Sequence, residues 1–137
     1  MKLDTAAFVG DPELVATLKA KARTVECAED RVLFVQGEIP TGVFIFEDGE
    51  VHLTMRSPEG ELVMDERAEP GSLLGLPGLV GNQGYSLSAY ARKGARIQFV
   101  AREEFSRLML TEPGIAMLIL KVLAAQVRTA RIAAANA

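Results

Sequence analysis

The sequence has little of the side-chain chemistry that catalytic and metal sites need. It contains one cysteine, one histidine and no tryptophan in 137 residues. A single cysteine cannot close a disulfide within the chain, and one cysteine with one histidine gives no ligand set for zinc or an iron–sulfur cluster. Only His52 is present to activate a serine nucleophile, and adjacent acids such as Glu103 and Glu104 point to different sides of an element. We therefore expect neither an enzyme nor a metal cofactor.

Charge and hydropathy argue against nucleic acid and membranes as direct partners. The formal net charge is −3, and the basic residues are scattered rather than gathered in a stripe. A domain that binds DNA by itself usually carries a basic surface, so we expect no DNA binding by this chain alone. No apolar run is long enough to cross a bilayer, and the first residues lack the apolar core of a secretory signal. These absences predict a cytoplasmic protein without a membrane partner.

What the sequence does contain is one globular domain, 1–137, of mostly β structure with helices at its ends. Asp11 and Pro12 are a helix-start signal, which predicts a first helix over 11–22. Short alternating or apolar runs follow to about residue 101, separated by glycine-containing turns. The Asp48–Gly49 pair predicts a hairpin between the strands that flank it. Many short strands at near-regular spacing favour an antiparallel sandwich or barrel, most plausibly a jelly roll.

The chain ends in a helical segment that we expect over 102–135. The stretch Glu112-Pro113-Gly114 divides it into a short helix and a long one. In the long helix, apolar residues recur at three- and four-residue intervals, the spacing of a helix-pairing seam. The residues expected in that dimer interface are Leu118, Val122, Ala125 and Thr129. The pattern predicts a homodimer formed through the last helix.

Several of these segments together resemble a known family. The run "RVLFVQGEIPTGVFIFEDGEVHL", the stretch "PGSLLGL" and the later "ARIQFVAREEFSRLM" follow one another as in cyclic-nucleotide-binding domains. The resemblance is to bacterial regulators of the catabolite activator and fumarate–nitrate reductase type, and it extends from about Leu14 to Arg131. It implies a β-roll (a double-stranded β-helix or jelly roll), a nucleotide pocket against a phosphate-binding cassette, and a long C-terminal dimerisation helix.

The cassette departs from the family pattern at the two positions that carry charge. Gly75 and Ser86 match the family, but Leu76 stands where a glutamate holds the ribose, and Tyr85 stands where an arginine pairs with the cyclic phosphate. No lysine or arginine lies between Pro70 and Tyr90. A charged hydrogen bond contributes about 1.5–3 kcal/mol, so its loss should weaken binding tenfold or more. We expect Gly75, Leu76, Tyr85 and Ser86 to line a pocket that does not bind cyclic AMP tightly.

Three interpretations of that pocket stay open at this point. It takes a different effector, neutral or flatter than cyclic AMP; or it is empty or self-filled, leaving a structural and dimerising module; or it binds a cyclic nucleotide by another route. A haem-based sensor would need an axial ligand, and His52 is expected on the solvent face of its strand. The sequence thus predicts the effector-sensing and dimerisation domain of a transcription regulator, with a degenerate cassette.

Overall fold

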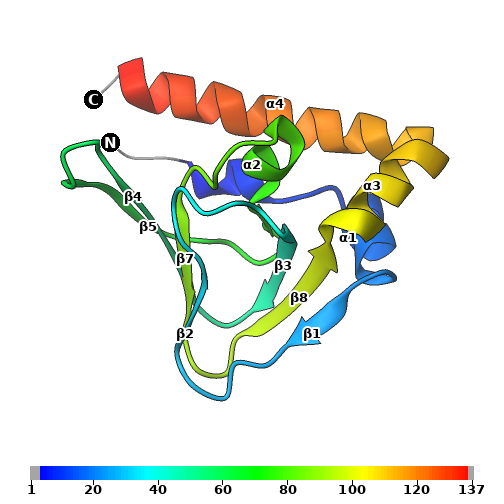
Figure 1. The fold of residues 1–137 in the computed structure, drawn as a ribbon, viewed down its shortest axis with the longest axis horizontal. Coiled ribbons are helices and arrows are strands. Elements are labelled where there is room, and N and C mark those ends of the chain that lie inside the picture. Colours follow the sequence, from blue (N-terminus) through cyan, green and yellow to red (C-terminus); the bar gives the residue numbers. More distant parts are fainter. Residues whose placement is uncertain (1–3, 136–137) are drawn as a thin grey trace.

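The computed structural model describes residues 4–135, with side chains up to Thr129, as eight strands and five helical segments (Figure 1). In chain order the elements are η1 (Thr5–Phe8), α1 (Pro12–Lys19), β1 (Arg23–Val25), β2 (Arg31–Phe34), β3 (Gly42–Asp48), β4 (Val51–Arg56), β5 (Leu62–Arg67), β6 (Leu73–Leu74), α2 (Leu76–Gly81), β7 (Ser88–Ala91), β8 (Arg96–Ala101), α3 (Arg102–Thr111) and α4 (Pro113–Ala135). The predicted mostly-β fold with flanking helices is confirmed.

The strands form two antiparallel sheets that face one another. One sheet has the order β1-β8-β3-β6 and the other has the order β2-β7-β4-β5. Consecutive strands often belong to different sheets, as expected for a jelly roll. Figure 1 shows the two sheets closing around a common interior, with the helices gathered on one side.

The predicted hairpin at Asp48–Gly49 is wrong. The turn is present, and Gly49 has the positive φ of 101° that such a turn favours. However, β3 pairs with β8 and β6, whereas β4 pairs with β5 and β7. The turn therefore carries the chain from one sheet to the other. A local turn signal reports a reversal of direction and not which strands share hydrogen bonds.

The helices agree more closely with expectation. Asp11 accepts a hydrogen bond from the Glu13 amide at the start of α1, and the two C-terminal helices meet at Pro113 as predicted. Helix α1 ends at Lys19 rather than near residue 22, because tighter turns then lead the chain into β1. The short η1 and β6 were not anticipated. Among the described residues no helix by itself is long and apolar enough to cross a bilayer; α3 and residues 113–129 of α4 reach that length only together, across a 116° bend.

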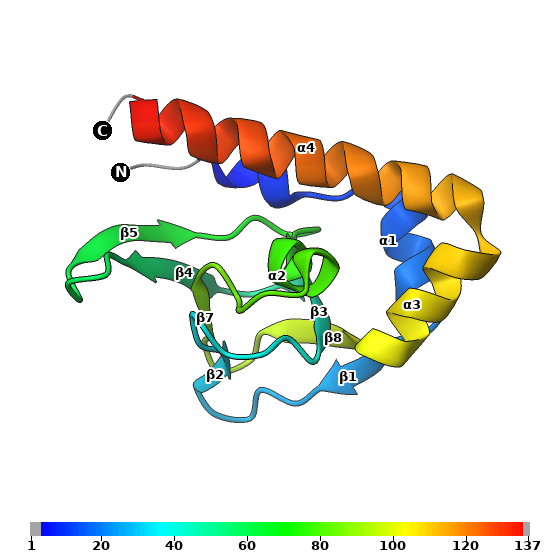
Figure 2. The same cartoon turned by 45° about the horizontal axis from the view of Figure 1, so that its top comes forward.

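Strand β3 is buried on both faces and divides the interior into two cores. Phe44 and Phe46 project into the roll, between the two sheets. Val43 and Ile45 project to the opposite face, where they pack with residues of α1, α2, α3 and α4. In Figure 2 the long α4 runs across this second layer and over η1. The cassette helix α2 therefore lies beside the helical core, at the edge of the roll.

We predict that Gly42→Ala destabilises the fold. A Cβ at Gly42 would lie 2.2 Å from the Val100 carbonyl oxygen and 2.6 Å from the Phe99 ring, so the β3–β8 pairing would have to shift. Overpacking of this kind costs about 1–3 kcal/mol. Urea unfolding followed by circular dichroism measures the change. Gly114→Ala is the matched control, because a Cβ there contacts nothing within 4 Å; equal stability of the two variants would contradict the prediction.

Candidate functional site

The cassette begins with a glycine that the local geometry requires. Gly75 has φ of +92° and precedes the first residue of α2. A Cβ at this position would lie 2.6 Å from Cε1 of Tyr85. The backbone at Gly75 and the ring of Tyr85 are thus in direct contact, so the structure brings together two of the four predicted pocket residues.

Tyr85 lies inside the roll and not at its surface. Its side chain is 4% exposed, and its ring stacks on Phe34 with centroids 4.2 Å apart. The hydroxyl donates to the Gly42 carbonyl at 3.0 Å and accepts from the Thr41 amide at 3.1 Å. The phenol is therefore held at both ends, by stacking along the ring and by two backbone hydrogen bonds at its tip.

The aromatic contacts continue from Tyr85 across the interior of the roll. Phe34 meets Phe44 at 5.5 Å between centroids, and Phe44 meets Phe99 at 4.8 Å. The guanidinium of Arg23 lies 4.8 Å from the Phe99 centroid, where it covers the outer end of the row. Aromatic pairs at these separations stabilise a core beyond the area they bury. The space next to Gly75 is part of this packed row.

The other two predicted pocket residues lie elsewhere. Leu76 is fully buried, but it belongs to the core between the sheet and the helices. Ser86 is exposed at the surface, one residue after Tyr85. Leu76 and Tyr85 therefore face different cores, although the cassette pattern placed both near one ligand.

The residues around Gly75 and Tyr85 provide no positively charged side chain for an anion, since no lysine or arginine lies between Pro70 and Tyr90. Tyr85 supplies an uncharged phenol, and that phenol already bonds the backbone of the 41–42 segment. A phosphate seated against Gly75 would have to displace the ring and leave the Thr41 N–H and Gly42 C=O without their partner. Leaving buried polar groups unpaired costs about 1–3 kcal/mol each.

The role of Thr41 and Gly42 was not found from the sequence. The sequence predicts only a turn in the loop before β3. Nothing in that loop indicates a contact with Tyr85, which lies more than forty residues away in the chain. The backbone also ties the two segments together, since the Gly37 amide donates to the Tyr85 carbonyl at 2.8 Å and the Tyr85 amide donates to the Glu38 carbonyl at 3.0 Å.

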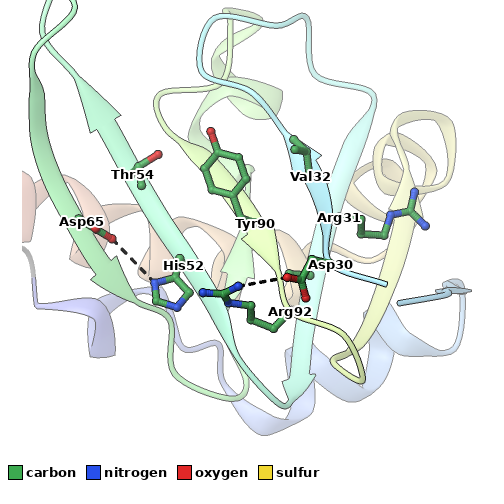
Figure 3. Close-up of a pocket in the computed structure, with 9 residues that line it drawn as sticks. Asp30, Arg31, Val32, His52, Thr54, Asp65, Tyr90 and Arg92 are labelled. Atoms are coloured by element: carbon green, nitrogen blue, oxygen red, sulfur yellow. Dashed lines mark hydrogen bonds and ion pairs between the residues drawn. The ribbon is translucent and has the colours of Figure 1, made fainter. Parts of the chain in front are cut away.

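A hollow of about 430 Å³ lies on the outer face of the sheet β2-β7-β4-β5 (Figure 3). Its lining residues are Asp30, Arg31, Val32, His52, Thr54, Asp65, Tyr90, Ala91 and Arg92. Both ring nitrogens of His52 face carboxylates: Nε2 contacts Glu50, and Nδ1 lies 3.8 Å from Asp65. His52 is on the outward face of β4, as predicted, and it lies within an ion-pair network rather than freely in solvent.

The charges around this hollow pair with one another. Hydrogen bonding to His52, followed by the charges of Arg67, His52 and Arg92, lowers the pKa of Glu50 despite some desolvation. The backbone N–H of Lys93, and then the side chain of Arg92, lower the pKa of Asp30. Arg92 bonds Asp30 at 3.1 Å. Since each of these acids already has basic partners, the hollow resembles a charged sheet face more than a prepared ligand site.

The remaining candidates for reactive chemistry are weak. Cys27 is buried, and desolvation raises the pKa of its thiol, against a smaller opposing effect of Arg31. A thiol with a raised pKa is a poor nucleophile, and Cys27 packs as a small residue of the core inside the roll. In the part of the chain that the structure describes, no three His, Cys, Asp or Glu side chains are placed to hold a metal ion.

The four residues expected in the dimer interface do not share one environment. Val122 is 6% exposed and packs inward with Ile115 and Ile119 against the chain's own helical core. Leu118 and Thr129 are half-buried, and Ala125 is exposed. Of the four residues predicted for the dimer interface, Val122 belongs to the buried face of α4. The other three, Leu118, Ala125 and Thr129, lie together on one side of that face.

Comparison with known families agrees with this geometry. The sequence model described as "Cyclic nucleotide-binding domain" matches residues 24–112, which include the whole roll and the cassette. No curated protein matches the chain by sequence.

Solved structures share the fold. The catabolite activator protein of Thermus thermophilus is 23% identical with a TM-score of 0.76, over 89% of this chain and 57% of that one. The N-terminal domain of a transcriptional regulator from Streptomyces coelicolor A3(2) is 23% identical with a TM-score of 0.66, over 86% of this chain and 84% of that one. A protein from a cyclic-GMP-dependent signalling pathway that regulates bacterial phytopathogenesis is 26% identical with a TM-score of 0.74, over 87% and 94%. With this fold, this cassette and the match over residues 24–112, the chain belongs to the cyclic nucleotide-binding domain family.

Proposed function

We propose that the chain is an effector-sensing and dimerisation module of a cytoplasmic transcription regulator, and that its cassette does not hold cyclic AMP tightly. The observation that supports weak binding of cyclic AMP is the position of Tyr85. Its ring occupies the space next to Gly75, and its hydroxyl bonds the backbone at Thr41 and Gly42. The family's charged partner for phosphate is absent from the segment between Pro70 and Tyr90.

The regulator assignment draws on the proteins that share the fold. They include a catabolite activator protein and the N-terminal domain of a transcriptional regulator. The chain spans 57% of the length of the Thermus thermophilus protein it matches, so DNA binding would belong to residues outside this region. Such relatives favour a regulatory role over an enzymatic one.

Signal transfer would use the contacts between the cassette and the C-terminal helices. Arg102, the first residue of α3, donates to the Pro40 carbonyl and reaches Asn82 Oδ1 at 3.4 Å. Asn82 caps α2, and Pro40 precedes the segment that bonds Tyr85. A change at the cassette is thereby linked to α3 and, through the packing of α3 on α4, to the dimerisation helix. An effector shifts such an equilibrium only by binding one arrangement better than the other.

A structural module without an effector is the second candidate, and the burial of Tyr85 favours it. A side chain that is 4% exposed, stacked on Phe34 and bonded at its tip acts as an internal substitute for a ligand. In this version the cassette has become part of the core, and the chain serves dimerisation alone.

Replacing Tyr85 tests the loss of cyclic AMP binding. We expect calorimetry to show cyclic AMP binding weaker than micromolar in the wild type, and Tyr85→Arg to raise the affinity tenfold or more, because the new guanidinium can pair with the phosphate. Tyr90→Arg is the matched control, since it adds the same charge on the exposed outer sheet face. Micromolar or tighter binding by the wild type would contradict the proposal.

Tyr85→Phe tests the internal-substitute interpretation. The variant keeps the stacked ring but removes the partner of the Thr41 N–H and the Gly42 C=O, so we expect the free energy of unfolding to fall by about 1–3 kcal/mol for each group. Urea unfolding measures it, and Tyr90→Phe on the exposed face serves as the control. Unchanged stability in Tyr85→Phe would show that the two hydrogen bonds do not hold the cassette.

A substitution at Ala125, the exposed residue of the predicted dimer interface, tests the dimer. We expect a wild-type dimer in sedimentation velocity and a monomer for Ala125→Glu, because charges facing each other across the two-fold axis repel. Ala124 is also exposed but points about 100° away around the helix, so Ala124→Glu should leave the dimer intact. A monomeric wild type would reject the dimer. A dimer that survives Ala125→Glu and is lost in Leu120→Glu would place the interface on the opposite flank of α4.

A further inference from the structure

An apolar groove of about 580 Å³ lies outside the roll, where α2, α3 and α4 meet. Its lining residues are Leu79, Val80, Asn82, Arg102, Phe105, Ser106, Met109, Leu110, Ala116, Ile119, Leu120 and Leu123. Leu110 is 85% exposed and Leu120 is 56% exposed, so large apolar side chains line the groove without cover from the described residues. Its volume falls within the range typical of small-molecule sites.

The polar groups of the groove are gathered at one end. Arg102 and Ser106 lie one turn apart in the first half of α3, and Asn82 caps the neighbouring α2. The lining residues of the second half of α3, Met109 and Leu110, are apolar, as are the four that α4 contributes. The groove therefore has a polar end and a long apolar trough.

The polar end is positively charged. Arg102 is the one charged side chain among the lining residues, and in the described part of the chain no carboxylate lies within 4.0 Å of it. Arg107, on the same helix, pairs instead with Glu104 at 2.6 Å. The bonds of Arg102 to the Pro40 carbonyl and to Asn82 hold the guanidinium in place, and a guanidinium has five N–H donors, more than those bonds use. The N-terminus of α3 adds a partial positive charge at the same end.

We propose that this groove binds an amphiphilic carboxylate, with its carboxylate on Arg102 and its alkyl or aryl body along the trough between α3 and α4. Charge and shape favour this class together: a single cation at one end suits a single anionic head, and the apolar lining suits an unbranched apolar body. Neither Gly75 nor Tyr85 lines this groove, so binding there does not require a cyclic nucleotide at the cassette. A ligand there touches α2, α3 and α4 at once, so its binding would change how α4 packs.

Dodecanoate and dodecan-1-ol are suitable probes, since they share the apolar body and differ in the charge of the head. Below the micelle concentration, calorimetry should show one dodecanoate bound per chain. We expect Arg102→Gln to weaken dodecanoate about tenfold or more and to leave dodecanol unchanged. The unchanged alcohol also reports that the variant is folded. Arg107→Gln, which removes a charge from α3 outside the groove, is the matched control and should change neither affinity.

A second variant tests the trough. Leu120→Lys places a charge on an exposed lining residue and should weaken both probes alike. The proposal is overturned if the wild type does not bind dodecanoate, or if Arg102→Gln affects the acid and the alcohol equally. A third result would also overturn the proposal: the wild type is a dimer in sedimentation, Leu120→Lys dissociates that dimer, and dodecanoate neither binds the wild type nor shifts its monomer–dimer equilibrium. A second copy of the chain would then cover the groove.

Discussion

Strand β3 of the sheet β1-β8-β3-β6 is buried on both faces, and the rest of the molecule is arranged around that constraint. In β3 the first five residues, 42–46, are all buried, with alternate side chains entering the roll and the helical layer. Fully burying a side chain such as Phe46 or Ile45 contributes about 1.5–3 kcal/mol, so each face needs a cover. The second sheet covers one face, and α1, α2, α3 and α4 cover the other. This is why the helices at both ends of the sequence meet on one side of the fold.

The same constraint explains how apolar packing holds the segment around Gly75 and Tyr85. Gly75 and Tyr85 meet at the β6 edge of this sheet, where Leu74 packs into the roll and Leu76 packs into the helical core. The ring of Tyr85 joins the row formed by Phe34, Phe44 and Phe99. The cassette backbone is then held by the core itself. The apolar groove beside α2 lies outside the roll, and Arg102 is the one charged residue among the lining residues that the structure describes.

Much of the local structure could be predicted from the sequence, because its signals act over a few residues. The Asp11–Pro12 start of α1, the division at Pro113 and the alternation that turns His52 outward all depend on neighbouring positions. The candidate site was predictable only in part. Gly75 and Tyr85 are in contact, whereas Leu76 entered a different core, and Thr41 and Gly42 were missed because their partner is distant in the chain.

The sequence by itself determined where the chain turns, which residues are apolar, and that no cation lies between Pro70 and Tyr90. The tertiary structure alone decided which strands pair across Asp48–Gly49, on which side of the sheet Leu76 and Tyr85 lie, and which face of α4 its own domain covers. The physical reason is the range of the interactions. Turns and helix starts are set by adjacent backbone geometry, whereas pairing and burial are shared between segments that meet only in the folded chain.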